Sequence, residues 1–266
     1  MPYLDMAAAV TAPAPKAYED NPASLRFFRD LIEPFGLTVD EELLRSGTQI
    51  SHRDLLDELF RDDVPRGTAE LVIVTHGLPD LLPFAVNAAH VNLMFGDHAD
   101  CFAISEQGLA APFTALRVIA AYQRSGRISR GVLVVLEQTT VPVPEPLIQQ
   151  NKLIDSGVLL AFSGSGELGI EAVHSCPSAE AGSRIAKLAA RDPASTLVVT
   201  GPDGPDGEPG AAVHRAAPGS YCTSVWLELA RNWREWVARY ACIVLGDVDQ
   251  RTGRGHVAVF RRAAGR

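Results

Sequence analysis

The chain has 266 residues, of which 47% are hydrophobic, 21% charged and 7% aromatic, with a formal net charge of −8. This composition excludes a largely disordered chain, and no apolar run reaches the roughly 18 residues of a membrane-spanning helix. Acidic and basic residues are mixed, so nothing indicates a nucleic-acid or lipid surface. Four scattered cysteines, without a CxxC pair or a signal peptide, favour reduced thiols and a cytoplasmic location.

Helices and strands are predicted to alternate along the first part of the chain. Ser24 and Ser51 are typical N-caps of amphipathic helices, and the continuous apolar run 70–74 predicts a buried strand. The next predicted elements are a helix at 83–95, a strand at 101–105, a helix at 113–125, a strand at 131–136 and a proline-rich loop at 139–150. Runs 157–162 and 170–174 predict a hairpin around a glycine-rich turn.

The second part repeats this order in a shorter form. The predicted elements are a helix at 181–190, a strand at 197–199, a Gly/Pro-rich loop at 201–210, a helix at 225–239, and strands at 242–245 and 255–260. The second of these helices carries all three tryptophans largely on one face, which indicates core or interface packing.

An internal repeat predicts the architecture. Residues 114–137 and 224–247 each run helix, turn and apolar strand at nearly the same length. We therefore expect an α/β protein of two βαβ-rich halves with parallel sheets covered by helices. The expected division is an N-terminal segment with one helix (1–50), a first half (51–175) and a shortened second half (176–266), in which only the loop 201–210 stands where the first half has a helix and a strand.

Several ordered motifs resemble one superfamily. They are Glu70–His76 followed by Leu82-Pro83-Phe84, Phe102–Gly108 leading into Ala115-Leu116, Gly131–Leu136, Ile154–Gly157, Pro218-Gly219-Ser220, and the closing segment Leu245–Val259. Their order and spacing resemble the thiolase superfamily and, within it, the ketoacyl-ACP synthase III branch, over about residues 50–266. The resemblance implies a thiolase-like α/β/α/β/α layered fold.

The resemblance also implies three catalytic residues, and this chain departs at each. The nucleophilic cysteine of the family would stand at Gly108 or Leu109, beside Gln107. The family's histidine falls near Thr200 and its asparagine near Ser220. A glycine cannot be acylated and a threonine cannot act as an imidazole. We therefore expect no catalytic residue in a degenerate pocket formed by His76, Gln107, Gly108, Leu109, Ser220 and Cys222.

The resemblance favours a non-catalytic subunit that pairs with an active ketosynthase and shapes its acyl pocket, in a fatty-acid-like or polyketide-like specialised pathway. In this superfamily the strand before the nucleophile pairs across a two-fold axis. The expected dimer strand is thus Cys101, Phe102, Ala103, Ile104 and Ser105. The expected partner is an active ketosynthase paralogue, or a second copy of the chain, with acyl carrier protein as a further partner. No cofactor and no metal are expected.

Two alternatives remain open. In the first, the chain is a diverged acyltransferase or hydrolase acting on acyl-ACP or acyl-CoA, with Ser105 (beside Glu106 and His76) or Cys222 as nucleophile. In the second, it is a homodimer that binds an acyl chain or a pathway intermediate. Two other patterns are weak. The run Asp97–Cys101 lacks a metal-ligand spacing, and Gly164–Gly169 matches GxGxxG but precedes a strand instead of the helix that dinucleotide binding needs.

Overall fold

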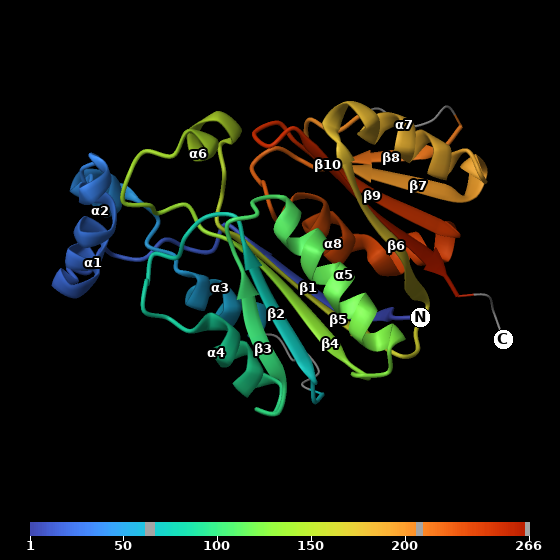
Figure 1. Ribbon diagram of the computed structural model, residues 1–266, viewed down its shortest axis with the longest axis horizontal. Coiled ribbons are helices and arrows are strands. Elements are labelled where there is room, and N and C mark those ends of the chain that lie inside the picture. The colour runs from blue at the N-terminus through green and yellow to red at the C-terminus, as the bar shows by residue number, and fades with distance from the viewer. Residues whose placement is uncertain (62–66, 206–209, 264–266) are drawn as a thin grey trace.

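The computed structural model describes residues 1–61, 67–205 and 210–263 (Figure 1). Within these residues the strands are β1 (Tyr3–Thr11), β2 (Leu71–His76), β3 (Asp100–Ile104), β4 (Gly131–Glu137), β5 (Ser156–Ser163), β6 (Leu168–Pro177), β7 (Thr196–Thr200), β8 (Ala212–Arg215), β9 (Cys242–Asp249) and β10 (Arg254–Arg262). The α-helices are α1 (Pro22–Ile32), α2 (Glu41–Ser46), α3 (His52–Leu59), α4 (Asn87–Met94), α5 (Ala110–Arg124), α6 (Pro146–Asn151), α7 (Ser178–Ala189) and α8 (Ser224–Arg239).

The strand order contains one arrangement twice. The strands hydrogen-bond in the order β3-β2-β4-β5-β1-β6-β10-β9-β7-β8. From the middle outwards, β1-β5-β4-β2-β3 of the first half corresponds to β6-β10-β9-β7-β8 of the second. In both halves the outer pairings are parallel and the inner ones antiparallel. The halves meet where Tyr3 pairs with Gly169 and Leu4 with Leu168. The duplication predicted from the sequence is therefore confirmed.

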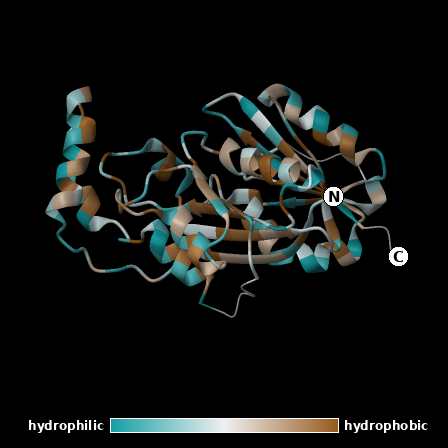
Figure 2. Ribbon diagram, turned by 60° about the horizontal axis from the view of Figure 1, so that its bottom comes forward, coloured by the Kyte–Doolittle hydropathy of each residue, from teal (hydrophilic) through white to brown (hydrophobic). Residues whose placement is uncertain are grey.

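The helices form the predicted layers around the two halves of the sheet. Apolar side chains of α5 and α8 share one core with strands of both halves, and the rings of Phe113 and Trp226 pack edge to face at 4.8 Å. Helices α3 and α4 cover the other face of the first half, and α7 covers that of the second. This is the expected α/β/α/β/α order, in which most strand residues are hydrophobic (Figure 2). None of the described helices is long and apolar enough to cross a bilayer.

Strand β2 shows why the central strands are continuously apolar. Leu71 and Ile73 pack in the layer of α5, whereas Val72 and Val74 pack against α3 and α4. Because both faces of the strand are buried, the sequence has no alternation of apolar and polar residues.

The N-terminal region differs from the expected segment with one helix. Strand β1 belongs to the first sheet, where it pairs antiparallel with β5 along most of its length, and two α-helices, α1 and α2, follow it. Because β1 lies between β5 and β6, the predicted hairpin does not form. The run of small residues 7–9 lacks the large or β-branched side chains typical of strands, so the pattern gave no signal for β1. The helix expected at 83–95 begins only at Asn87.

The second half is shorter than the first between β7 and β8. The described residues there, 201–205 and 210–211, form turns and contain no helix. The Arg215 guanidinium donates to the carbonyls of Pro202 (3.1 Å) and Gly204 (2.7 Å), which ties the turn to β8. Residues 206–209 of the predicted loop 201–210 lie outside the described part of the chain.

Candidate functional site

The turn after β3 leads directly into α5. Glu106 and Gly108 have φ angles of 60° and 50°, in the left-handed region. Helix α5 begins two residues later, and its N-cap Leu109 provides no side-chain hydrogen bond. The positive end of the helix dipole therefore faces this turn. Position 108 is where the resemblance places the nucleophile, and glycine presents no side chain there.

The side chain of Tyr221 fills the space beside Gly108. A Cβ atom on Gly108 would overlap the Tyr221 hydroxyl and would lie 3.3 Å from Cζ of the same ring. The Tyr221 hydroxyl donates to Asp249 Oδ2 at 3.0 Å. Burial raises the pKa of Tyr221, so the phenol stays protonated and keeps donating to Asp249. The space beside the position at which the resemblance places the nucleophile is thus occupied by a protonated phenol from the second half.

Glu137 anchors the segment that carries Tyr221. This carboxylate ends β4, is completely buried, and accepts the backbone N–H of Tyr221 at 2.9 Å. It also accepts the N–H of Thr223 at 3.1 Å and its hydroxyl at 2.9 Å. Burial raises the pKa of Glu137, and these hydrogen bonds oppose that rise. The carboxylate therefore fixes the turn at residues 221–223 against the first half.

Cys222, one alternative nucleophile, points into the same junction. Its side chain is 1% exposed, and Sγ donates to the carbonyl of Leu136 at 3.4 Å. Burial and then the neighbouring Glu137 raise the pKa of this thiol well above its usual value. Because the reactive form of cysteine is the thiolate, the geometry disfavours Cys222 as a nucleophile.

The positions expected to replace the family's histidine and asparagine carry hydroxyls. Thr200 ends β7, is fully buried, and its Oγ1 has no hydrogen-bond partner among the described residues. Ser220 follows Gly219, whose carbonyl accepts the N–H of Ile154 at 2.9 Å. The Pro218–Ser220 segment thus approaches the Ile154–Gly157 segment, and neither hydroxyl supplies imidazole chemistry.

Two buried aspartates stand at the end of β9, beside these positions. Asp247 lies next to Gly201, and Asp249 accepts the Tyr221 hydroxyl. Burial raises the pKa of Asp247 to about 7, and the N–H of Val248, which donates to Oδ1 at 2.9 Å, opposes this rise. Two carboxyl groups therefore lie beside the positions at which the resemblance places the histidine and the asparagine. The sequence pattern missed their role because they follow an ordinary apolar strand.

His256 on β10 lies near this acidic pair. Its Nδ1 is 3.0 Å from Ser175 Oγ, and its ring stacks on Phe113 at 5.4 Å. Burial lowers the pKa of His256, which favours the neutral imidazole. Although His256 appears isolated in the sequence, β-pairing places it opposite Asp247.

Ser105, Glu106 and His76 do not form a hydrolytic triad among the described residues. Ser105 and Glu106 are exposed. His76 Nδ1 instead donates to the carbonyl of Leu78 at 2.8 Å, and its ring lies beside His52 at 4.9 Å. Gln107, also exposed, accepts the hydroxyl of Thr114 at 2.8 Å. Of the expected pocket residues, the structure brings Gly108 and Leu109 together with Cys222 around Tyr221, whereas His76 and Gln107 make other contacts.

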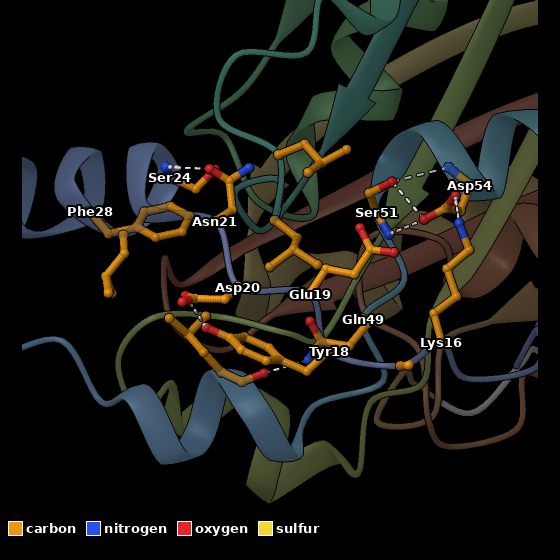
Figure 3. A pocket seen from close by; sticks show the side chains of 15 residues that line it. Lys16, Tyr18, Glu19, Asp20, Asn21, Ser24, Phe28, Gln49, Ser51 and Asp54 are labelled. Carbon is orange, nitrogen blue, oxygen red and sulfur yellow. Dashed lines mark hydrogen bonds and ion pairs between the residues drawn. The ribbon is translucent and has the colours of Figure 1, made fainter.

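One cavity of about 540 Å³ lies beneath the N-terminal end of α1 (Figure 3). Its polar side chains are mostly paired with each other: Ser51 and Asp54 form a capping box, Lys16 bonds Asp54, and Asn21 accepts the N–H of Ser24. These contacts hold the segment before α1 in place. Among the described residues, no group of three His, Cys, Asp or Glu side chains is placed to hold a metal ion.

Comparisons with known proteins identify the fold. No protein-family profile and no curated protein sequence matches the chain. Among solved structures, β-ketoacyl-ACP synthase III (FabH) from Thermus thermophilus matches with a TM-score of 0.63 and 16% identity, covering 99% of this chain and 100% of that one. The tetronic acid condensing enzyme AbyA1 gives 0.61 and 14%, covering 98% and 100%. A variant of OleA from Xanthomonas campestris with bound lauric acid and lauroyl-CoA gives 0.62 and 13%, covering 98% of each chain.

These matches extend over nearly the whole chain, including both halves of the duplicated strand order. The chain therefore has the thiolase fold, in the form found in ketoacyl-ACP synthase III-type proteins.

Proposed function

We propose that the chain is a non-catalytic, ketosynthase III-like subunit that pairs with an active ketosynthase and shapes its acyl pocket. The observation that carries this proposal is the Tyr221 side chain beside Gly108, where the enzymes of this fold would need a free nucleophile. A buried phenol with a raised pKa cannot accept an acyl group near neutral pH. The partner would supply the cysteine, histidine and asparagine.

The edge strand β3 supports the pairing. It is the outermost strand of the first half (Figure 1), and its residues 100–103 are exposed, unlike those of the central strands. Its stretch Cys101–Ile104 carries no charge, although natural edge strands commonly use charge or proline to prevent association. Nearby apolar side chains are also open, with Phe84 64%, Val86 68% and Phe102 38% exposed. Such a surface is typical of a protein interface.

Native mass spectrometry of the full chain, expressed from its own operon, tests the proposal. We expect a one-to-one complex with an active ketosynthase. Phe102→Asp should abolish that complex, because it buries an unpaired charge at the interface. The matched control is Val213→Asp on β8, an exposed apolar residue on the opposite edge strand, which should leave the complex intact.

Three outcomes would contradict the proposal. A monomer under all conditions would remove the partner, and a complex that survives Phe102→Asp would place the interface elsewhere. A homodimer that Phe102→Asp dissociates would identify a second copy of the chain as the occupant of β3, as in the intermediate-binding alternative.

The acyltransferase or hydrolase alternative receives no comparable support. Cys222 is buried as a protonated thiol, and Ser105 is exposed and has no hydrogen bond to Glu106 or His76 in the described structure. Incubation with acyl-CoA followed by intact-mass measurement should give no adduct. A stable adduct mapped to either residue would favour the enzyme instead.

A further inference from the structure

A second cavity, of about 620 Å³, lies between α1, α4, β3 and the loop that follows β2. Its volume is within the range of roughly 300–1,000 Å³ typical of small-molecule sites. Most of the wall is apolar, including Phe27, Phe28, Leu31, Ile32, Val86 and Phe102. Neither Gly108 nor Tyr221 lines this cavity, so it is distinct from the space beside Gly108, at the start of α5, that Tyr221 fills.

Polar groups concentrate where α3 begins. His52 is 1% exposed, and its backbone N–H donates to Asp80 Oδ1 at 2.9 Å. The other oxygen of Asp80 accepts the side-chain amide of Asn87 at 2.8 Å. His52 Nδ1 lies 3.7 Å from that same oxygen, while Nε2 is buried without a partner among the described residues. Burial lowers the pKa of His52 to about 4, so the ring is neutral near pH 7.

His76 presents a second imidazole to this cavity. Its Nδ1 bonds a carbonyl oxygen, that of Leu78, at 2.8 Å. Because a carbonyl can only accept, Nδ1 carries the hydrogen, and in this tautomer the lone pair of the imidazole is at Nε2. No described residue donates a hydrogen bond to that Nε2. The rings of His76 and His52 lie 4.9 Å apart in a mostly apolar wall. His52 Nε2 is buried without a hydrogen-bond partner among the described residues, and His76 is only partly buried.

The charged residues that line the cavity disfavour an anionic ligand. Asp80 and Glu145 line the cavity, and none of the described lysines and arginines does. An anionic head group would therefore meet carboxylates without a compensating cation. An uncharged hydroxyl avoids this cost and can donate to an imidazole lone pair.

We propose that this cavity binds an uncharged amphiphile, with an apolar body against α1 and β3 and a hydroxyl that donates to His76 Nε2. This site does not depend on the pairing proposed above. The cavity borders β3 through Cys101, Phe102 and Ala103, so a bound molecule would lie beside the proposed interface.

Isothermal titration calorimetry of the full chain at pH 8, with 1-octanol and octanoate as probes, tests the proposal. Octanol should saturate one site, and octanoate should bind at least about tenfold more weakly, a difference of about 1.4 kcal/mol. Ala89→Trp, which fills the cavity from α4, should weaken octanol binding by at least about tenfold. The matched control is Ala17→Trp in the other cavity, which should leave octanol binding unchanged.

Nuclear magnetic resonance with carbon-13-labelled histidine keeps the test valid if Ala89→Trp does not fold. Octanol should shift the signals of His76 and His52 but not that of His214, which is paired with Glu228 on α8. The proposal is overturned if octanol gives no saturable heat, if octanoate binds as tightly, if a folded Ala89→Trp binds octanol normally, or if the shifts occur at other histidines.

Discussion

The contact between Gly108 and Tyr221 makes a quantitative prediction. Gly108→Ala places a side chain at a φ of 50°, which costs roughly 1–2 kcal/mol in the left-handed region. The new Cβ also displaces the Tyr221 hydroxyl from Asp249. Losing that hydrogen bond leaves Asp249 Oδ2 without its donor, while Oδ1 keeps the N–H of Arg251, and costs about 1–3 kcal/mol more. The single substitution should thus lower the free energy of unfolding by about 2–5 kcal/mol.

Tyr221→Phe removes the overlapping oxygen and should rescue part of this loss. The nearest remaining ring atom, Cζ, lies 3.3 Å from the new Cβ, a contact that a small shift can relieve. In the Tyr221→Phe background, Gly108→Ala should therefore cost only its backbone strain of about 1–2 kcal/mol. The two substitutions together should cost about 1–3 kcal/mol less than the sum of the single effects.

Urea denaturation followed by fluorescence of the three buried tryptophans of α8 measures this coupling. The control is Gly126→Ala, because Gly126 has a φ of 71° but no atom near the position of its Cβ. It should show backbone strain alone and add to Tyr221→Phe without coupling. If Gly108→Ala and Tyr221→Phe add to within about 0.5 kcal/mol, with unchanged dependence on urea, Tyr221 does not occupy the nucleophile position.

Two further predictions concern buried titratable groups. The folded-state pKa of Asp247, about 7, lies above its unfolded value near 3.8. Between these two pH values the folded state binds more protons than the unfolded state. The stability contributed by Asp247 therefore falls as the pH rises from the lower value to the higher. Asp247→Asn should therefore gain stability relative to the wild type from pH 5 to pH 8 in urea titrations, and a constant difference would refute the assignment. For the cysteines, iodoacetamide at pH 8 should label exposed Cys101 at least about tenfold faster than Cys222 in peptide mass mapping. Equal labelling of the native protein would show that the thiol of Cys222 is accessible.

Much of the fold follows from patterns that act locally. The apolar run of β2 requires burial on both faces, and the repeated helix, turn and strand at 114–137 and 224–247 predicts two equivalent halves. Strand β1 could not be predicted in this way, because its alanines show neither strand propensity nor alternation. Its conformation is set by pairing with β5, more than 140 residues away along the chain.

The candidate site was predicted less completely, for a related reason. The position of the turn at Gly108 could be predicted by counting residues from its flanking motifs. The residue whose side chain fills the space beside Gly108 could not be predicted in this way. Tyr221 reaches Gly108 only because Glu137, at the end of β4, accepts the backbone N–H groups of Tyr221 and Thr223. That contact joins residues 84 and 86 positions apart. Nothing in the local sequence around either residue encodes it.

The closed site and the open edge strand are consistent with one physical account. An active site must keep polar groups unpaired and a cavity empty, which reduces stability. Here the space beside Gly108 holds Tyr221, whose phenol is hydrogen-bonded to Asp249 and whose backbone is bound by Glu137, so part of those costs is avoided, although Thr200 Oγ1 stays buried without a partner among the described residues. Strand β3, by contrast, keeps exposed apolar side chains and unpaired backbone groups that a stable monomer would be expected to protect. Burial of this edge by association with another chain is what the Phe102→Asp experiment tests.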